Sequence, residues 1–309
     1  MSFRHRPAGW IAVTLAVLAC LASCTGNPAE VRQDGAALPA RPGHYLGVYE
    51  PGSDQSWTPV QAFATAVGHQ PDIVLMYSNW FERFQRAFAE RAAAHGAIPM
   101  IQLQPMNISL PAIVAGRYDT YLRSYATAVR SFGHPVILSF AHEMNGNWYS
   151  WGYPHVSPAV WVAAWRHVVS LFRSLGANNV TWLWAPNAEE PGAPPLSAYW
   201  PGARYVTWVG LDGYLATWTD TFSSVFSQSI GAIRRLTAQP LLIAETAVGP
   251  VAGQVVKIGE IFSGMQQYRL LGIVWFDVAQ HGGITRQDWR LEGNPAALAE
   301  FRSEVRRYW

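Results

Sequence analysis

Eight short apolar runs, separated by longer stretches with helical spacing, restrict the architectures open to this 309-residue chain. Within each run the apolar residues are nearly continuous instead of alternating with polar ones, as is typical of parallel strands covered on both faces. The runs occupy residues 44–50, 72–78, 97–104, 135–143, 180–187, 205–214, 240–246 and 272–277. We therefore predict an α/β protein in which strands and helices alternate.

The stretches between the runs have the periodicity of amphipathic helices. Ser157 and Pro158 suit a helix start, and Gly176 suits its end. The apolar residues between them fall on one helical face and are expected to pack against the sheet. They are Trp161, Trp165, Val168, Phe172 and Leu175. A second stripe of this kind runs from residue 118 to residue 132.

This alternation favours a single (β/α)8 barrel, the TIM barrel, over residues 44–309. An open, doubly wound sheet is the alternative, but no glycine-rich phosphate-binding fingerprint follows the first run. In a barrel of this type, functional side chains lie at the carboxyl ends of the strands. These ends carry Glu50, Asn79, Trp80, Gln104, His142, Glu143, Asn187, Asp212, Tyr214, Glu245, Trp275 and Asp277.

Composition supports a folded domain and excludes some classes of partner. Half of the residues are hydrophobic and 14% are charged, which allows a large core and argues against global disorder. The net charge of +2, without a Lys/Arg-rich block, excludes an extended nucleic-acid surface. The 15 tryptophans suit contact with flat, half-apolar ligands such as sugars.

The N-terminus resembles an export signal. Basic residues at 4–6 precede an apolar run at 10–22, which is shorter than the ~20 residues that span a bilayer. The run ends in Leu-Ala-Ser-Cys, a lipobox-like sequence that predicts lipidation of Cys24. We expect a signal peptide over 1–23, a flexible tether over 24–43, and a protein anchored at the cell envelope or surface. A cleaved secretory signal and an uncleaved anchor are the alternatives.

Two of the strand ends carry a glutamate after a long apolar run, namely Glu143 and Glu245. A carboxylate at the edge of a core is costly unless it is paired or used. Two such groups flanking one cleft are what glycoside hydrolysis requires, because one protonates the leaving oxygen and the other attacks the sugar or activates water. The simpler interpretation of either one alone is a structural carboxylate bound by an arginine or a backbone N–H group.

Other chemistries fit the sequence less well. The segment after His142 begins like a zinc-protease helix, but Gly146 occupies the position of the second histidine. No Gly-x-Ser-x-Gly nucleophile elbow is present. Both cysteines, Cys20 and Cys24, lie in the N-terminal segment, so the folded part has no thiol. We therefore expect no metal and no organic cofactor.

The segment HEMNGNWYSWG at 142–152 resembles the acid/base motif of glycoside hydrolase family 26, which is best known for β-mannanases. The resemblance extends over most of the chain from about residue 45. Its other segments are 116–146, 179–187, 199–214, 240–246, 273–277 and 288–290. Membership of this family implies a barrel whose acid/base ends the fourth strand and whose nucleophile ends the seventh. Glu143 and Glu245 resemble these two residues.

The same resemblance implies roles for neighbouring side chains. His142 resembles a substrate-contacting histidine, and Trp148 an aromatic wall of the cleft. Tyr214 resembles the tyrosine that hydrogen-bonds the nucleophile, with a loop anchor as the alternative. Trp275 resembles the platform under the cleaved sugar, with barrel packing as the alternative. Gln104, at a strand end, is a further candidate for substrate contact.

The resemblance implies a retaining endo-β-glycanase, most simply one acting on β-1,4-mannan. The chain departs from common family patterns at Ser139, where members often have arginine, and around Glu245 and residues 203–207. Because of these departures, β-1,3-1,4-glucan and β-1,3-xylan stay open as substrates. A glycan-binding lipoprotein without hydrolytic activity is the alternative from another class. We expect a monomer whose partners are the polysaccharide and, through the lipid anchor, a membrane.

Overall fold

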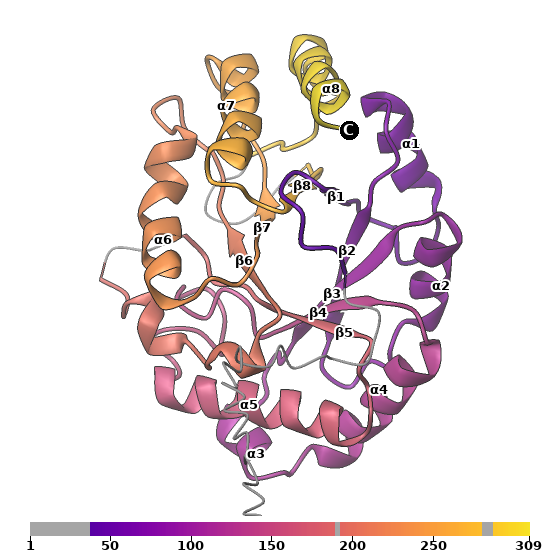
Figure 1. Cartoon of the computed structure of the whole chain (residues 1–309), viewed down its shortest axis with the longest axis vertical. Coiled ribbons are helices and arrows are strands. Elements are labelled where there is room, and N and C mark those ends of the chain that lie inside the picture. Colours follow the sequence, from indigo (N-terminus) through magenta and orange to yellow (C-terminus); the bar gives the residue numbers. More distant parts are fainter. Residues whose placement is uncertain (1–37, 189–191, 280–286) are drawn as a thin grey trace, which may run out of the picture. The chain divides into compact units, whose positions relative to one another are not determined.

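The computed structural model describes residues 38–188, 192–279 and 287–309. Eight parallel strands form a closed barrel in which each strand pairs with the next and β8 pairs with β1. Helices surround this barrel (Figure 1). The predicted single (β/α)8 barrel is confirmed.

The strands match the eight predicted runs, with short shifts at their ends. They are β1 (Tyr45–Tyr49), β2 (Ile73–Asn79), β3 (Ile98–Gln104), β4 (Val136–Phe140), β5 (Val180–Trp184), β6 (Trp208–Asp212), β7 (Leu241–Thr246) and β8 (Gly272–Phe276). The α-helices are α1 (Thr58–Val67), α2 (Arg86–Ala94), α3 (Leu110–Val114), α4 (Asp119–Phe132), α5 (Pro158–Ser174), α6 (Phe222–Leu236), α7 (Gln254–Gln267) and α8 (Pro295–Tyr308). Two 3₁₀ turns, η1 (Leu196–Tyr199) and η2 (Ala203–Tyr205), lie between β5 and β6.

The barrel interior is filled by side chains that alternate along the strands. Small residues are placed where neighbouring strands crowd the axis. A Cβ added to Gly47 of β1 would lie 2.7 Å from Cγ2 of Val274 in β8, so only glycine fits there. The interior cluster consists of Tyr45, Ile73, Leu75, Met100, Ile137, Leu183, Ala185, Trp208, Leu242, Ala244, Leu271 and Val274. It closes the barrel below the mouth and supports the side chains of the site.

The helix predicted after Ser157 is α5, and its two tryptophans are core residues, as expected. Trp161 and Trp165 are fully buried, and their rings stack with centroids 5.3 Å apart. The indole of Trp161 donates a hydrogen bond to the carbonyl of Ala141, 3.0 Å away. This contact ties α5 to the segment that follows β4, so the helix layer helps to position the mouth of the barrel.

Residues 1–37 lie outside the described part of the chain, so the predicted signal peptide, Cys24 and most of the predicted tether are not described. The last tether residues contact the barrel: Tyr45 Oη donates to the carbonyl of Pro39 at 2.8 Å, and Gly43 N donates to Leu270 O at 2.8 Å. Within the described ranges, no helix is long and apolar enough to cross a membrane.

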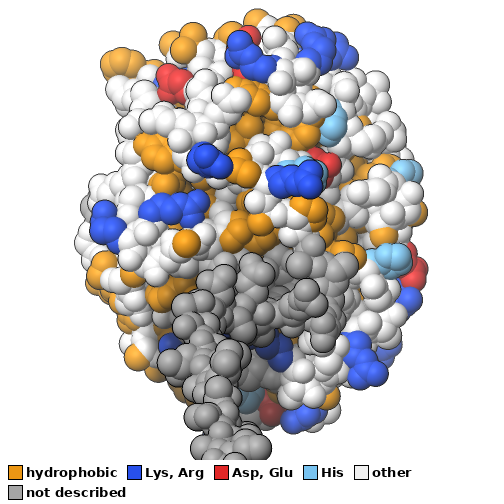
Figure 2. Space-filling model, in the orientation of Figure 1, with side chains coloured by type: hydrophobic (Ala, Val, Ile, Leu, Met, Phe, Trp, Pro, Cys, Tyr) orange, Lys and Arg blue, Asp and Glu red, His pale blue; other side chains and the backbone are white. Residues whose placement is uncertain are grey.

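The face drawn in Figure 2 shows basic and acidic side chains scattered among uncharged ones. No block of a single sign gathers on the coloured part of this face. The distribution agrees with the small net charge of the chain.

Candidate active site

Glu245 is held at the mouth of the barrel by three hydrogen-bond donors. Tyr77 Oη and Gln102 Nε2 donate to Oε1 at 2.5 and 2.9 Å, and Tyr214 Oη donates to Oε2 at 2.8 Å. The residue is 5% exposed, and burial raises the pKa of Glu245 above its ordinary value. The three donors oppose that rise. The carboxyl group is therefore fixed in one orientation by partners that favour its ionised form.

An irregularity of the sheet directs Glu245 toward the mouth. The register between β6 and β7 shifts so that Asp212 pairs with Glu245, and the register between β7 and β8 shifts between Ile243 and Thr246. Ala244 already faces the barrel interior, so a regular strand would turn the next side chain outward. Bulges of this kind re-aim a side chain next to active sites.

Glu143 lies on a strained turn just beyond β4. Ala141 and Glu143 have φ values of +49° and +50°, a left-handed conformation that residues with a Cβ rarely adopt. The turn is held by hydrogen bonds from Glu143 N to Ala185 O at 2.7 Å and from Gly146 N to Glu143 O at 2.9 Å. Such strain persists only where the surroundings enforce it, and it clusters at functional sites.

Trp148 binds Glu143 directly. Its indole Nε1 donates to Oε2 of Glu143 at 2.6 Å, while 37% of the residue is exposed. A Cβ on Gly146 would lie 2.3 Å from the Trp148 ring, so the ring lies closely over a glycine. One face of the indole is thereby backed by the chain, and the residue stays open to a ligand, which suits a wall of a cleft.

Three carboxyl groups meet at this point. One oxygen each from Glu143, Asp212 and Glu245 lies within 4.8 Å of the others. Asp212 is fully buried, and its oxygens have no hydrogen-bond partner among the described residues. Burial and then the charges of Glu245 and Glu143 raise the pKa of Asp212 well above its usual range. Carboxyl groups this close oppose one another's ionisation, which favours protonated forms within the cluster.

These carboxylates form a group of three acidic residues close enough to share an ion. Their surroundings do not resemble a cation site. Both oxygens of Glu245 and Oε2 of Glu143 already accept hydrogen bonds from neutral donors, and Asp212 favours its protonated form.

His142 lies beneath the aromatic loop that follows β4. It is 1% exposed, and its Nε2 lies 3.2 Å from Tyr149 Oη. Tyr149 stacks on Trp151 at 4.2 Å, and Trp151 Nε1 donates to the carbonyl of His142 at 2.7 Å. Burial lowers the pKa of His142 to about 3, so the imidazole is neutral. His142, a predicted substrate contact, is therefore buried and lies next to Tyr149.

Gln104 and Tyr214 lie at the mouth, as expected from their strand ends. Gln104 is half-buried at the end of β3, on the same face as Gln102. Tyr214 follows β6 and binds Glu245, which is the contact that the family resemblance implies for it. Its ring lies 4.9 Å from that of Trp289.

The platform predicted at Trp275 is wrong. Trp275 is fully buried and packs edge-on against Phe301 of α8, with centroids 5.0 Å apart. It therefore faces the helix layer, which is the barrel-packing alternative. The next residue, Phe276, faces inward and stacks on Tyr49 at 5.0 Å. Since successive strand residues point to opposite faces, an error of one residue exchanges a cleft side chain for a core side chain.

The sequence patterns indicated neither a role for Asp212 nor the two donors to Glu245, Tyr77 and Gln102. Tyr77 and Gln102 stand inside apolar runs, on the inward-facing positions of β2 and β3. A polar residue at an inward position near a strand end is the signal that would have identified them.

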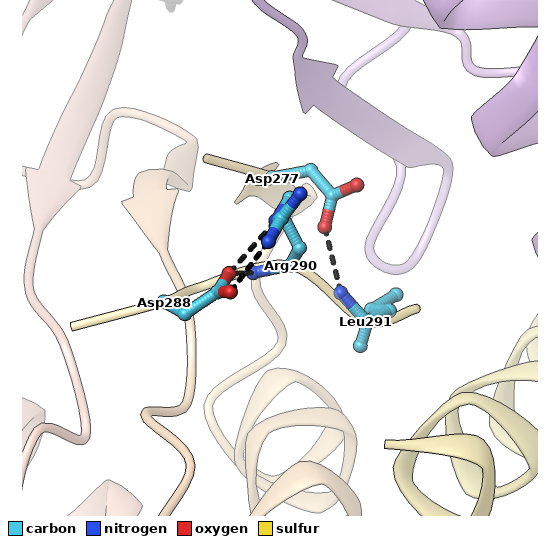
Figure 3. A network of polar contacts seen from close by, with 4 residues as sticks. All are labelled: Asp277, Asp288, Arg290 and Leu291. Carbon is cyan, nitrogen blue, oxygen red and sulfur yellow. Dashed lines mark hydrogen bonds and ion pairs between the residues drawn. The ribbon is translucent and has the colours of Figure 1, made fainter. Parts of the chain in front are cut away.

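A second acidic pair lies where β1 and β8 end. Burial, followed by the neighbouring Asp277, raises the pKa of Glu50 to about 10, and burial raises the pKa of Asp277 to about 6. The two carboxyl groups share a hydrogen bond, and Leu291 N donates to Asp277 at 3.0 Å. The guanidinium of Arg290 turns instead to Asp288, which it binds at 2.9 and 2.6 Å (Figure 3). The buried pair therefore keeps a proton between its members.

Comparison with known proteins bears on these residues directly. Residues 122–281 match the model of glycosyl hydrolase family 26, a range that includes Glu143, Asp212, Tyr214 and Glu245. The chain belongs to this family. The resemblance noted in the sequence is thereby confirmed.

Three curated relatives of this chain are named for activity on three different polysaccharides. Endoglucanase H of Acetivibrio thermocellus is 29% identical over 82% of this chain and 29% of its own length. Beta-1,3-xylanase TXYA of a Vibrio species is 31% identical over 34% of this chain and 22% of its own length. Mannan endo-1,4-beta-mannosidase A and B of Caldalkalibacillus mannanilyticus is 32% identical over 26% of this chain and 17% of its own length. The chain spans less than a third of the length of these relatives.

Solved structures of family 26 mannanases share the fold. The catalytic domain of a Bacillus sp. JAMB-750 enzyme aligns with a TM-score of 0.64 at 19% identity, covering 85% of both chains. A modular mannanase of Cellulomonas fimi aligns with a TM-score of 0.67 at 16% identity, covering 85% of this chain and 71% of the other.

Proposed function

We propose that the protein is a retaining endo-β-glycanase in which Glu143 is the general acid/base and Glu245 the nucleophile. The observation that carries this proposal is the close approach of the two carboxyl groups at the barrel mouth, with one oxygen of each within 4.8 Å. A retaining pair lies ~5–5.5 Å apart, whereas an inverting pair needs ~6.5–9.5 Å to admit a water molecule. The separation therefore supports retention.

In the first step, ionised Glu245 attacks the anomeric carbon and forms a glycosyl ester. The bond to the leaving oxygen breaks as Glu143 transfers its proton to that oxygen. In the second step, Glu143 takes a proton from water, whose oxygen attacks the same carbon and releases Glu245. Net retention follows from the two inversions. Repulsion between the two carboxyl groups helps to hold a proton on Glu143 while Glu245 is charged.

The contacts of the two glutamates fit these different roles. Glu245 accepts from two phenols and an amide, which fix the carboxylate for attack. The indole of Trp148 occupies Oε2 of Glu143. The raised pKa of Asp212 limits the negative charge that this third carboxyl group adds to the cluster.

The substrate we propose is a neutral β-linked glycan. Mannanase relatives and the motif around Glu143 support β-1,4-mannan. The match to Endoglucanase H covers 82% of this chain and favours a β-glucan as the second candidate. The test is a hydrolysis screen on β-1,4-mannan, mixed-linkage glucan and β-1,3-xylan, with Glu143→Gln as the blank. If no polymer is cleaved while one is still bound, the protein is a glycan-binding module instead.

We also propose that the protein is a lipoprotein anchored through Cys24. The lipobox-like sequence before Cys24 supports this, and a diacyl or triacyl anchor gives the stable attachment that a single chain does not. Wild-type protein is expected in the membrane fraction, and Cys24→Ala in the soluble fraction or unprocessed. A mature wild-type protein that is wholly soluble, with another N-terminal residue, would contradict the anchor.

A further inference from the structure

Exposed aromatic side chains gather on the catalytic side of the barrel. In the described part of the chain, the largest exposed aromatic residues are Phe81, Trp148 and Trp218, which are 61%, 37% and 74% exposed. They follow β2, β4 and β6, respectively, so all three lie on loops at the carboxyl ends of strands. Single exposed apolar residues are ordinary, but their concentration on the functional side of a barrel is not explained by packing.

Trp218 projects from a loop that is fixed beside the nucleophile's strand. Leu215 N donates to Ala247 O, and Gly249 N donates to Leu215 O, each at 3.0 Å. The tip is closed by a hydrogen bond of 2.7 Å from Thr217 N to Oδ2 of Asp220. Within the described ranges, no other aromatic ring packs against Trp218. The loop therefore presents a large apolar surface in a defined place.

Phe81 is presented in a comparable way. Its φ of +70° is unusual for a residue with a Cβ. Its ring contacts those of Tyr118 and Tyr121 edge-on, at 5.8 and 5.5 Å. The preceding residue, Trp80, is buried, so at this turn one aromatic side chain packs inside and Phe81 stays outside. Backbone strain that exposes a phenyl ring indicates a use for that ring.

The two rings lie on opposite sides of the mouth. In the closed barrel β2 and β6 are four strands apart in either direction, and Figure 1 shows them on opposite sides. Glu143 follows β4, between them on one side, and Glu245 lies on β7, between them on the other. The strand order therefore places the two glutamates between the loop that carries Phe81 and the loop that carries Trp218.

We infer that Phe81 and Trp218 are the outer sugar-stacking platforms of one cleft that crosses the mouth and binds a neutral β-linked glycan on both sides of the cleavage point. The inference rests on the proposed function and makes the action endo. Sugar rings present C–H faces that stack on aromatic rings. The loop carboxylates are internally satisfied: Asp220 accepts from Thr217 N, and Glu82 accepts from the side chain and backbone of Asn79. These two carboxylates therefore exert little attraction on a cationic ligand.

The test compares two substrates for each variant. One is the polysaccharide that the wild type cleaves fastest among β-1,4-mannan, mixed-linkage glucan and β-1,3-xylan. The other is a dinitrophenyl β-disaccharide of the same sugar, which is too short to reach both rims. For Trp218→Ala and Phe81→Ala, the ratio of kcat/KM on polymer to kcat/KM on the disaccharide should fall roughly 3- to 10-fold, the range expected for one lost aromatic contact. Trp218→Phe should recover part of the loss.

Val256→Ala is the matched control, because Val256 is 67% exposed but lies on α7. It should leave the ratio unchanged. A wild-type ratio in both aromatic variants would overturn the inference. Gel retardation by the three polymers separates the two proposals. If the wild type cleaves no polymer but is retarded by one, and Trp218→Ala is not retarded, the result supports the sugar-stacking role and contradicts the proposed hydrolysis. If the wild type is neither active nor retarded, both fail.

Discussion

Two acidic pairs lie at the mouth of this barrel, and they differ in what surrounds them. Glu50 and Asp277, at the ends of β1 and β8, bind each other, and Asp277 is also approached by the backbone N–H group of Leu291 and the buried indole of Trp275. Glu245 accepts hydrogen bonds from two tyrosines and a glutamine, and Glu143 accepts one from an exposed tryptophan. Both pairs are buried. Only the second is oriented by separate donors beside a surface that a ligand can reach.

The comparison shows why carboxyl burial by itself does not identify a catalytic pair. Burial raises the pKa of a member of both pairs. What distinguishes Glu245 is the set of donors that favour and orient its charged form. A nucleophile must be ionised and aimed, whereas a structural acid pair needs only to satisfy its own protons.

The largest expected difference is in catalysis. Glu245→Ala and Glu143→Ala should each lower kcat on polysaccharide by roughly 10⁴-fold or more, as removal of a central catalytic group does. Glu50→Gln should retain most of the activity, because Glu50 lies outside the reacting cluster. Initial rates of reducing-sugar release measure this. Similar losses in Glu50→Gln and Glu245→Ala would remove the distinction between the two pairs.

The next difference separates core tryptophans from the cleft tryptophan. Trp161→Ala and Trp275→Ala should each lower the free energy of unfolding by roughly 3–5 kcal/mol, because both rings are fully buried. Trp148→Ala should leave stability nearly unchanged and reduce activity, since the exposed indole binds Glu143. Denaturant unfolding and polysaccharide hydrolysis are measured on all three. A stable Trp275→Ala variant with selectively impaired activity would restore the platform role that the structure rejects.

A smaller effect is expected from removing one donor to the nucleophile. Tyr214→Phe should lower kcat/KM roughly 10- to 100-fold, the value of a hydrogen bond to a charged group. The bond from Tyr214 lowers the pKa of Glu245, so its loss should move the acidic limb of the pH–activity profile to higher pH. Tyr45→Phe is the control, because Tyr45 donates to Pro39 outside the site. An unshifted acidic limb in Tyr214→Phe would show that Glu245 does not govern it.

The smallest effect concerns stability and pH at the other pair. The pKa values of Glu50 and Asp277 are about 10 and about 6, both raised by burial, so the folded state binds these protons more tightly than the unfolded chain. The resulting stabilisation is complete at low pH and is lost as pH rises through about 6 toward about 10. Glu50→Gln should flatten this decline in Tm. Glu90→Gln, at an exposed position paired with Arg86, should follow the wild type.

The sequence was sufficient to predict the barrel because continuous apolar runs and helical stripes are local patterns. It also identified Glu143 and Glu245, since a glutamate that ends an apolar run is costly unless it has a role. The sequence did not predict that Trp275 is a core residue. Successive side chains of a strand point to opposite faces, and which face Trp275 takes depends on the register between β8 and β1. The partnership of Tyr77 and Gln102 with Glu245 depends on the closure of the barrel, which brings residues 168 and 143 positions apart into contact.

The central claim is that Glu245 attacks the sugar while Glu143 handles the proton. It is tested most directly by the product that Glu143→Ala forms from an activated aryl β-glycoside in the presence of azide. This variant retains the nucleophile and its three donors, so the glycosyl ester should form without an acid, and azide should then displace Glu245. The account predicts a β-glycosyl azide, identified by proton NMR. An α-glycosyl azide, formed by direct displacement at the substrate, would contradict it.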